Sequence, residues 1–251
     1  MSRKPNNKIL RLLLPAAFWL AVWWGVSAWV GQELLVPPPV SVVRRFFQLA
    51  ATALFWRSTA VSLLRIFCGT LAGIVLGTVC AWATSRFPPA DWLLSPAIRV
   101  VRATPVASFI ILVLLWVKTS RVPGVISALM VLPVLWESVS SGVKAVDPQL
   151  LELAKAYRFS RRKTLRYIYL PTLRHYFSAG VNNAIGLAWK SGVAAEVLCL
   201  PRAAIGTQVY YSKIYLETPS LFAWTAVVIL LSMALEKLVH WALKEKGGHE
   251  A

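Results

Sequence analysis

The sequence predicts an all-α, polytopic membrane protein with about six transmembrane helices, on three observations. The 251 residues are 57% hydrophobic with a mean hydropathy of +0.61, and only 15% are charged, against about a quarter in a soluble domain. Uncharged runs recur, several close to the roughly 20 residues that a bilayer-spanning helix needs. No alternating barrel pattern occurs, and helices satisfy their own backbone groups in lipid.

We expect a single transmembrane domain over residues 1–251. Extending the uncharged runs past a charge at one end gives spans at about 10–30, 62–85, 92–117, 122–143, 174–198 and 219–243. Cytoplasmic loops carry an excess of Lys and Arg, which favours a cytoplasmic location for both chain termini and for the basic stretch 144–174. The first run is longer than a signal-peptide core and contains four tryptophans, so we interpret it as an uncleaved span.

Two shorter features precede the third span. Prolines 37–39 should end the first helix, and Ser41 could then cap a short amphipathic helix at the outer interface. Within the second span, Gly69, Gly73 and Gly77 share one face, which predicts close packing against another helix and no transport role.

Residues 148–171, "PQLLELAKAYRFSRRKTLRYIYLP", form a basic amphipathic segment between the fourth and fifth spans. Pro148 suits the first turn of one short helix, and Ser160 can cap a second that runs to Pro171. The chain should turn around Arg158 and Phe159. An exposed apolar face could dock into a partner protein, or the basic segment could lie on anionic lipid. Physical arguments alone leave these two interpretations equal.

The spacing within this segment resembles the cytoplasmic loop of the permease subunits of bacterial ATP-binding-cassette (ABC) importers. That loop has E-A-A-x-x-x-G, then nine residues, then I-x-L-P. Here Glu152-Leu153-Ala154 is followed by Arg158 in the glycine position and by Ile168-Tyr169-Leu170-Pro171 in register. Four further fragments resemble the sulfonate, taurine and nitrate branch: "VPPP", "SLLRIFCG", "RVVRATPVASF" and "LAWKSGVAAEVL". The resemblance covers about residues 30–245.

The resemblance implies a type I importer permease (MetI-like) architecture with a cytoplasmic coupling helix, in a bacterial plasma (inner) membrane. The implied partners are cytoplasmic ABC ATPase subunits, an extracytoplasmic substrate-binding protein and a second permease copy, all around a lipid bilayer. The implied substrate is a small anion such as an alkanesulfonate, taurine, nitrate or bicarbonate. ATP and magnesium would be used by the ATPase, because the sequence has no GxxxxGK[ST] motif. We expect no cofactor or metal on this chain and no enzymatic activity of its own.

By the same resemblance, one set of residues should couple the permease to its ATPase: Glu152, Leu153, Ala154, Tyr157, Arg158, Phe159, Ile168 and Pro171. Two positions depart from the motif. Leu153 replaces an alanine, which could enlarge the docking face. Arg158 replaces the glycine, at a cost of about 1–2 kcal/mol if the turn needs a left-handed backbone.

A second set is predicted to line a translocation pathway, because polar or ionisable residues inside spans are functional candidates: Arg102, Glu137, Asn183, Trp189, Lys190 and Glu196. Asn183, Gly186 and Lys190 share one helical face. A structural role is the competing interpretation: Lys190 could neutralise Glu137, or Glu196 of an opposing subunit. Arg102 could equally pack at a subunit interface.

Other classes of function are disfavoured. The net charge of +17 is better explained by loops and lipid headgroups than by nucleic acid. The three cysteines show no CxxC spacing, and no nucleophile–base cluster is visible. The rival hypothesis is a stand-alone secondary carrier or membrane scaffold whose basic loop binds lipid.

Overall fold

The computed structural model describes residues 7–245, and every regular element in that range is helical. The elements are α1 (Asn7–Val30), α2 (Pro39–Ala50), α3 (Ala53–Arg86), α4 (Pro88–Ala103), α5 (Val106–Leu114), α6 (Val122–Lys144), α7 (Pro148–Ala156), α8 (Arg161–Thr164), the π-helical turn η1 (Leu165–Tyr169), α9 (Leu170–Cys199), α10 (Ile205–Ile214) and α11 (Thr218–Glu245). The all-α prediction is confirmed. The terminal residues used to predict orientation, 1–6 and 246–251, lie outside the described range.

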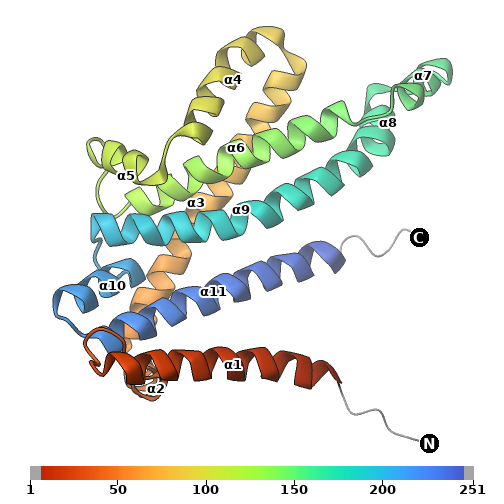
Figure 1. Cartoon of the computed structure of the whole chain (residues 1–251). Helices are drawn as coiled ribbons and strands as arrows, with labels where there is room; N and C mark the ends of the chain where they lie inside the picture. Colours follow the sequence, from red (N-terminus) through yellow and green to blue (C-terminus); the bar gives the residue numbers. More distant parts are fainter. Residues whose placement is uncertain (1–6, 246–251) are drawn as a thin grey trace, which may run out of the picture.

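Helices α6, α9 and α11 run side by side, α3 crosses obliquely behind them, and the molecule has two distinct ends (Figure 1). Helices α3, α6 and α9 form the centre, with α11 against α9 and α2. Helices α2, α5 and α10 gather at one end, here called the α10 end. Helices α7 and α8 project at the opposite end, called the α7 end, where α1 begins and α11 finishes.

Small residues let the central helices approach closely, as the glycine spacing predicts. A Cβ atom on Gly73 would lie 2.6 Å from the carbonyl oxygen of Ala128, and one on Gly77 would lie 2.6 Å from that of Leu132. Real Cβ atoms cannot approach backbone this closely, so only glycine permits the observed α3–α6 contact. The glycine face therefore serves packing.

The span expected over residues 92–117 is not one straight helix. The structure breaks it into α4 and α5, which are bent by 108°. Thr104 is extended, with φ −79° and ψ 132°, and Pro105 follows it. A residue before proline is driven out of the helical region by its clash with the proline ring, so the break follows from this one dipeptide.

Length and composition support fewer complete spans than the six expected. Among the described residues, three helices are long and apolar enough to cross a membrane, namely α3, α6 and α11. The bent α4–α5 pair is either a fourth, broken span or a re-entrant loop. The described apolar part of α1, Leu14–Val30, is shorter.

Two helix starts differ from the predictions. The short helix after the prolines exists as α2, but it begins at Pro39 with Pro38 in the capping position and not at Ser41, because proline is favoured in a first helical turn. Helix α3 begins at Ala53, well before residue 62. The Thr52 hydroxyl accepts a hydrogen bond from the Phe55 amide and caps it there.

Candidate functional site

The predicted coupling segment, residues 148–171, forms the tip of the α7 end, beyond the ends of α6 and α9 (Figure 1). Helix α7 starts as expected: Pro148 occupies its first turn, and the Asp147 side chain accepts a hydrogen bond from the Gln149 amide at 2.8 Å. Ser160 caps α8 by accepting from the Lys163 amide at 3.4 Å. The two short helices of the prediction are therefore present.

The turn between α7 and α8 has the geometry in which helices usually end at a glycine, but here the residue in the glycine position is Arg158. The Phe159 amide donates to the Ala154 carbonyl at 2.8 Å, and the Arg158 amide donates to the Lys155 carbonyl at 3.0 Å. This pair of bonds defines a Schellman motif, whose left-handed residue is usually glycine. Arg158 occupies that position with φ 49°. The glycine position of the motif thus keeps a left-handed backbone, at a cost of about 1–2 kcal/mol for a side chain there.

Helix α7 has two different apolar faces. Its inner face carries Ala154, which is buried and borders a cavity of about 540 Å³ between α7 and the α8–η1 segment, with Phe159 and Leu165. Its outer face exposes Leu150, Leu153 and Tyr157, with 54% of Leu153 and 71% of Tyr157 accessible. These three positions follow helical spacing, so they form one exposed apolar stripe.

The second short helix does not stop at Pro171 as predicted. Helix α8 continues through η1 into α9, and the Leu170 amide bonds to the Leu165 carbonyl across the π turn. Pro171 lies in the first turn of α9, while Ile168 is half-buried within η1. A π turn shifts the hydrogen-bonding register by one residue, and this shift accommodates the missing proline donor without ending the helix.

The predicted pathway residues divide into an exposed group and a buried group. Arg102 and Glu137 form an ion pair, with side chains that are 60% and 50% exposed. Asn183 and Lys190 are also exposed, on the same helix, α9. Trp189 and Glu196, on the same helix, are buried.

An acid absent from the sequence-based prediction borders the exposed group. Glu236, on α11, packs its carboxylate against Gly186: a Cβ atom added to Gly186 would lie 2.7 Å from the Glu236 Oε1 atom. The same carboxylate accepts a hydrogen bond from the Ser232 hydroxyl at 3.2 Å. Gly186 lies on the face predicted for Asn183 and Lys190. The available signal was an acid that directly follows the uncharged run 219–235 and falls inside the predicted span 219–243.

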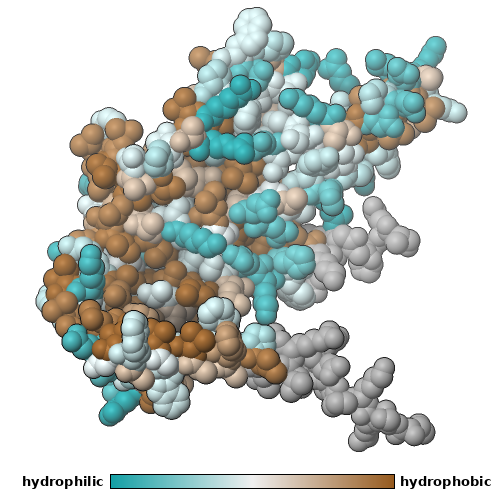
Figure 2. All heavy atoms as spheres, viewed as in Figure 1, coloured by the Kyte–Doolittle hydropathy of each residue, from teal (hydrophilic) through white to brown (hydrophobic). Residues whose placement is uncertain are grey.

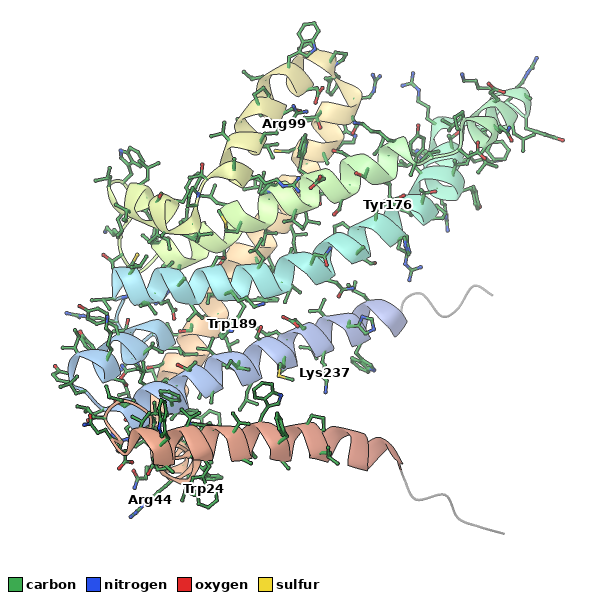
Figure 3. The ribbon with its side chains drawn as sticks, in the orientation of Figure 1. Trp24, Arg44, Arg99, Tyr176, Trp189 and Lys237 are labelled. Atoms are coloured by element: carbon green, nitrogen blue, oxygen red, sulfur yellow. The ribbon has the colours of Figure 1, made fainter. Side chains whose placement is uncertain are left out.

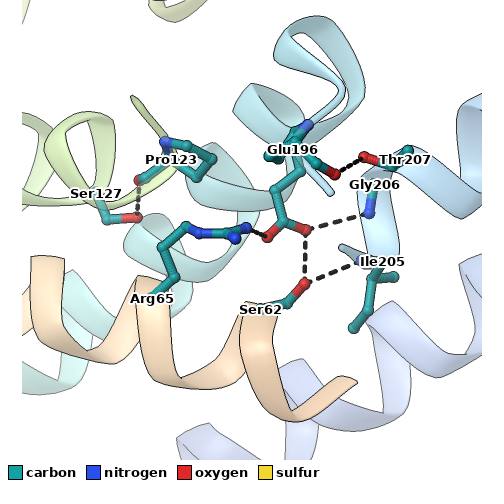
Figure 4. A network of polar contacts seen from close by, with 9 residues as sticks. Ser62, Arg65, Pro123, Ser127, Glu196, Ile205, Gly206 and Thr207 are labelled. Atoms are coloured by element: carbon teal, nitrogen blue, oxygen red, sulfur yellow. Dashed lines mark hydrogen bonds and ion pairs between the residues drawn. The ribbon is translucent and has the colours of Figure 1, made fainter. Parts of the chain in front are cut away.

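Trp189 and Glu196 form hydrogen bonds that link α9 to neighbouring helices. The Trp189 indole N–H donates to the Val228 carbonyl at 3.0 Å and ties α9 to α11 (Figure 3). The Glu196 carboxylate accepts from Arg65 at 3.0 Å, from Ser62 at 2.8 Å and from the Gly206 amide at 3.1 Å (Figure 4). It therefore joins α3 and α9 to the start of α10.

Within the subunit, both acids considered as partners of Lys190 pair with other cations. Glu137 is paired with Arg102, and Glu196 is paired with Arg65 inside its own subunit. Lys190 forms an ion pair with neither of these acids within the subunit. Ser62 and Arg65 were not predicted as site residues, although both stand in the fragment "SLLRIFCG" that carried part of the resemblance.

Comparison with known proteins identifies relatives along most of the chain. Residues 73–243 match the family described as binding-protein-dependent transport system inner membrane component. The taurine transport system permease protein TauC of Escherichia coli K12 is 27% identical over 226 residues, covering 86% of this chain and 81% of the relative. The riboflavin transport system permease protein RibX of Chloroflexus aurantiacus is 24% identical over 226 residues, covering 89% and 82%.

Two solved structures share the fold. A crystal structure of an amino acid ABC transporter with histidines aligns with a TM-score of 0.62 at 20% identity, covering 79% of this chain and 96% of the other. A bacterial ABC transporter involved in the import of the acidic polysaccharide alginate aligns with a TM-score of 0.63 at 12% identity, covering 96% of both chains.

Proposed function

The chain belongs to the family of binding-protein-dependent transport system inner membrane components and is a permease of an ABC importer, and from that premise we propose how it couples to ATP hydrolysis and what it carries. Permeases of this family work with an ATPase and a substrate-binding protein. We propose that residues 148–171 dock onto the ATPase, which would use ATP and magnesium, and that closure of the ATPases moves the membrane helices through this segment.

The apolar stripe of α7 is the observation that carries the coupling proposal. Leu150, Leu153 and Tyr157 are exposed at the tip of the molecule, beyond the ends of the spans. A helix that presents an apolar stripe at helical spacing fits a hydrophobic groove on a partner. A lipid-binding loop would place such residues alongside the bilayer, whereas α7 projects past α6 and α9 (Figure 1). Docking onto a partner protein is therefore favoured over binding to lipid.

Orientation follows from the same proposal. A segment that meets a cytoplasmic ATPase places the α7 end in the cytoplasm, together with the start of α1 and the finish of α11. The basic residues of 144–174 then lie inside, as positive-inside counting requires. The α10 end faces the substrate-binding protein.

We propose that a second copy of the chain covers the exposed polar group and completes the pathway. Arg102, Glu137, Asn183 and Lys190 lie in predicted spans yet are exposed in a single subunit. Charged side chains within a membrane avoid lipid and face protein or a water-filled cavity. Their exposure supports a dimer with the translocation path between the two subunits.

The proposed substrate is a small anion of the alkanesulfonate, taurine, nitrate or bicarbonate class. Its support is the named substrates of the relatives: taurine for the Escherichia coli permease, and aliphatic sulfonates for a putative Bacillus subtilis permease that is 23% identical over 243 residues. Riboflavin, named for the Chloroflexus aurantiacus relative, is the competing class. Binding studies on the associated substrate-binding protein decide between them.

Capture of the ATPase tests the coupling proposal. The chain is purified from native membranes in mild detergent, and mass spectrometry identifies what accompanies it. We expect a Walker-motif ATPase with the unaltered chain and loss of that ATPase with Leu153→Glu/Tyr157→Glu, because both side chains are exposed and their replacement spares the fold.

The opposite end of the molecule offers a matched control. Tyr215 and Leu216 are also exposed, at 70% and 64%, so Tyr215→Glu/Leu216→Glu makes the same chemical change at the α10 end and should retain the ATPase. Recovery of the unaltered chain alone, under conditions that preserve known importer complexes, would instead favour a stand-alone carrier with a lipid-binding loop.

A further inference from the structure

A polar cavity of about 460 Å³ lies where the end of α3, the helix α4 and the second half of α6 meet. On α4, Asp91, Ser95, Arg99 and Arg102 recur every three or four residues and so share one face. Helix α6 presents its own polar face at 137–144. Hydrophilic side chains gather over α4 beside α6 on the surface (Figure 2), and Arg99 lies on α4 (Figure 3). Two helices in a membrane protein thus turn polar faces toward a shared space.

Positive charge is in excess in this cavity. Three cations and two carboxylates line it. The Glu137 carboxylate is paired with Arg102, and the Asp91 carboxylate accepts a hydrogen bond from the Ser95 hydroxyl. The neutral Ser95 hydroxyl does not cancel the Asp91 charge, so the lining keeps a net charge of +1. Among the described residues, Arg99 and Lys144 are its cations without an ion pair.

A buried hydroxyl group adds a hydrogen-bond donor. The Ser140 Oγ atom is buried in the cavity wall, and the part of the chain that the structure describes offers it no hydrogen-bond partner. A buried hydroxyl without a partner is destabilising, so a ligand oxygen that accepts a hydrogen bond from Ser140 would relieve this cost.

We infer that this cavity is a binding site for an oxyanion of the sulfonate or phosphate class. The Arg99 guanidinium offers a planar fork of donors to two oxygens, which suits sulfonate and phosphate geometry. Lys144 supplies a second positive charge, and Ser140 donates to a further oxygen. The volume is within the range of small-molecule sites, about 300–1,000 Å³. The inference rests on the proposed function for its physiological ligand.

The position of the cavity defines two sources of such an oxyanion. Lys144 is the last residue of α6, and Asp91 lies in the first turn of α4, so the cavity opens near the α7 end of the spans. A transported sulfonate would reach this site before its release to the cytoplasm. A lipid headgroup phosphate would reach the same depth from the inner leaflet.

Titration with ethanesulfonate tests the inference. The permease is reconstituted in phosphatidylcholine nanodiscs, and binding is followed by calorimetry and by the shift in Tm. We expect saturable binding that weakens by about tenfold to hundredfold in Arg99→Gln, because one charge-assisted hydrogen-bonding group is lost. Ser140→Val, which removes the buried hydroxyl, should weaken binding in the same direction.

Arg57→Gln is the matched control, since Arg57 is exposed at the start of α3, away from the cavity, and its loss should leave binding unchanged. A parallel series in nanodiscs containing phosphatidylglycerol separates the two sources. Stabilisation by that lipid alone, lost in Arg99→Gln, identifies a headgroup phosphate as the oxyanion. The site is overturned if neither ethanesulfonate binding nor stabilisation by phosphatidylglycerol is observed, or if Arg99→Gln shows the same binding and stabilisation as the unaltered chain.

The ATPase capture experiment tests the proposed coupling, and the ethanesulfonate titration tests the oxyanion site, so the two can fail independently. Arg99 lies on α4, apart from α7 and α8 (Figures 1 and 3), so Arg99→Gln should retain the ATPase. Failure of the unaltered chain to capture an ATPase would count against the proposed coupling, while the ethanesulfonate titration would still decide the oxyanion site.

Discussion

The α10 end and the α7 end of this permease differ in which side chains they bury and which they expose. At the α10 end, Glu196 is completely buried, and three groups of its own chain bond to its carboxylate. At the α7 end, Leu153 and Tyr157 are exposed on an apolar stripe. Buried groups that are satisfied internally stabilise the fold, whereas exposed apolar groups gain free energy only when a partner covers them. Substitutions at the two ends should therefore act on different quantities.

The largest effect on stability should come from Glu196→Ala. Removing one partner of a buried ion pair leaves Arg65 uncompensated, and such losses destabilise by about 3–5 kcal/mol. The Arg65 side chain is only 15% exposed, so water relieves little of that cost. Unfolding in detergent, followed by circular dichroism, measures the change.

Glu137→Ala provides the contrast, because it also removes a paired acid, but an exposed one. Exposed pairs contribute about 0–1 kcal/mol, so the unfolding midpoint of Glu137→Ala should stay near that of the unaltered chain. Equal losses in Glu196→Ala and Glu137→Ala would contradict the view that burial makes the α10-end network structural.

A smaller loss should follow from Gly73→Ala in the central packing. The new methyl group would collide with the Ala128 backbone and the Val131 side chain, and overpacking of this kind costs about 1–3 kcal/mol. Gly25→Ala is the matched control, because a Cβ atom there would meet nothing within 4 Å. Its helix should be unchanged or slightly stabilised. Thermal unfolding of both variants reports the difference.

At the α7 end, Arg158→Gly should stabilise rather than destabilise. Glycine adopts the left-handed conformation of residue 158 without strain, which relieves about 1–2 kcal/mol. Hydrogen–deuterium exchange of the amides in the last turn of α7 should slow. Arg162→Gly places the same change in the helical backbone of α8, where glycine is unfavourable, and exchange there should accelerate. Faster exchange in Arg158→Gly would show that the turn is not strained.

The smallest effect concerns pH at the α10 end. A hydrogen bond from Ser220 and one from Arg45, together with the Arg45 charge, lowers the pKa of Glu217 below its ordinary 4.5. Because the pKa is lower in the folded state, the contact contributes stability above the unfolded pKa and is lost as pH falls through the folded value.

The contribution should be small, about 0–1 kcal/mol, since the Arg45–Glu217 pair is largely exposed. In Glu217→Gln the fall in Tm on acidification should be slightly shallower than in the unaltered chain. Glu33→Gln, which changes another exposed acid, should retain the original profile. An identical profile for Glu217→Gln would assign the pair no role in stability.

Local signals account for what was predictable. Pro148 lies in the first turn of α7, Ser160 caps α8, and the motif from Glu152 to Pro171 locates residues 148–171 between two spans. Each signal involves residues within a few positions of one another, where capping and backbone preferences act directly. The cost expected at Arg158 was likewise predictable, because the left-handed conformation belongs to a single residue.

The sequence by itself determined the helical membrane class, the two short helices of residues 148–171 and the permease family. Only the tertiary structure decided that Glu196 pairs with Arg65, 131 positions away in the chain, that Trp189 is an internal tie, and that α4 and α5 diverge by 108°. Such pairings depend on how each helix is rotated about its axis and on which neighbour it meets. Helical periodicity places a residue on a face, but packing alone selects what that face contacts.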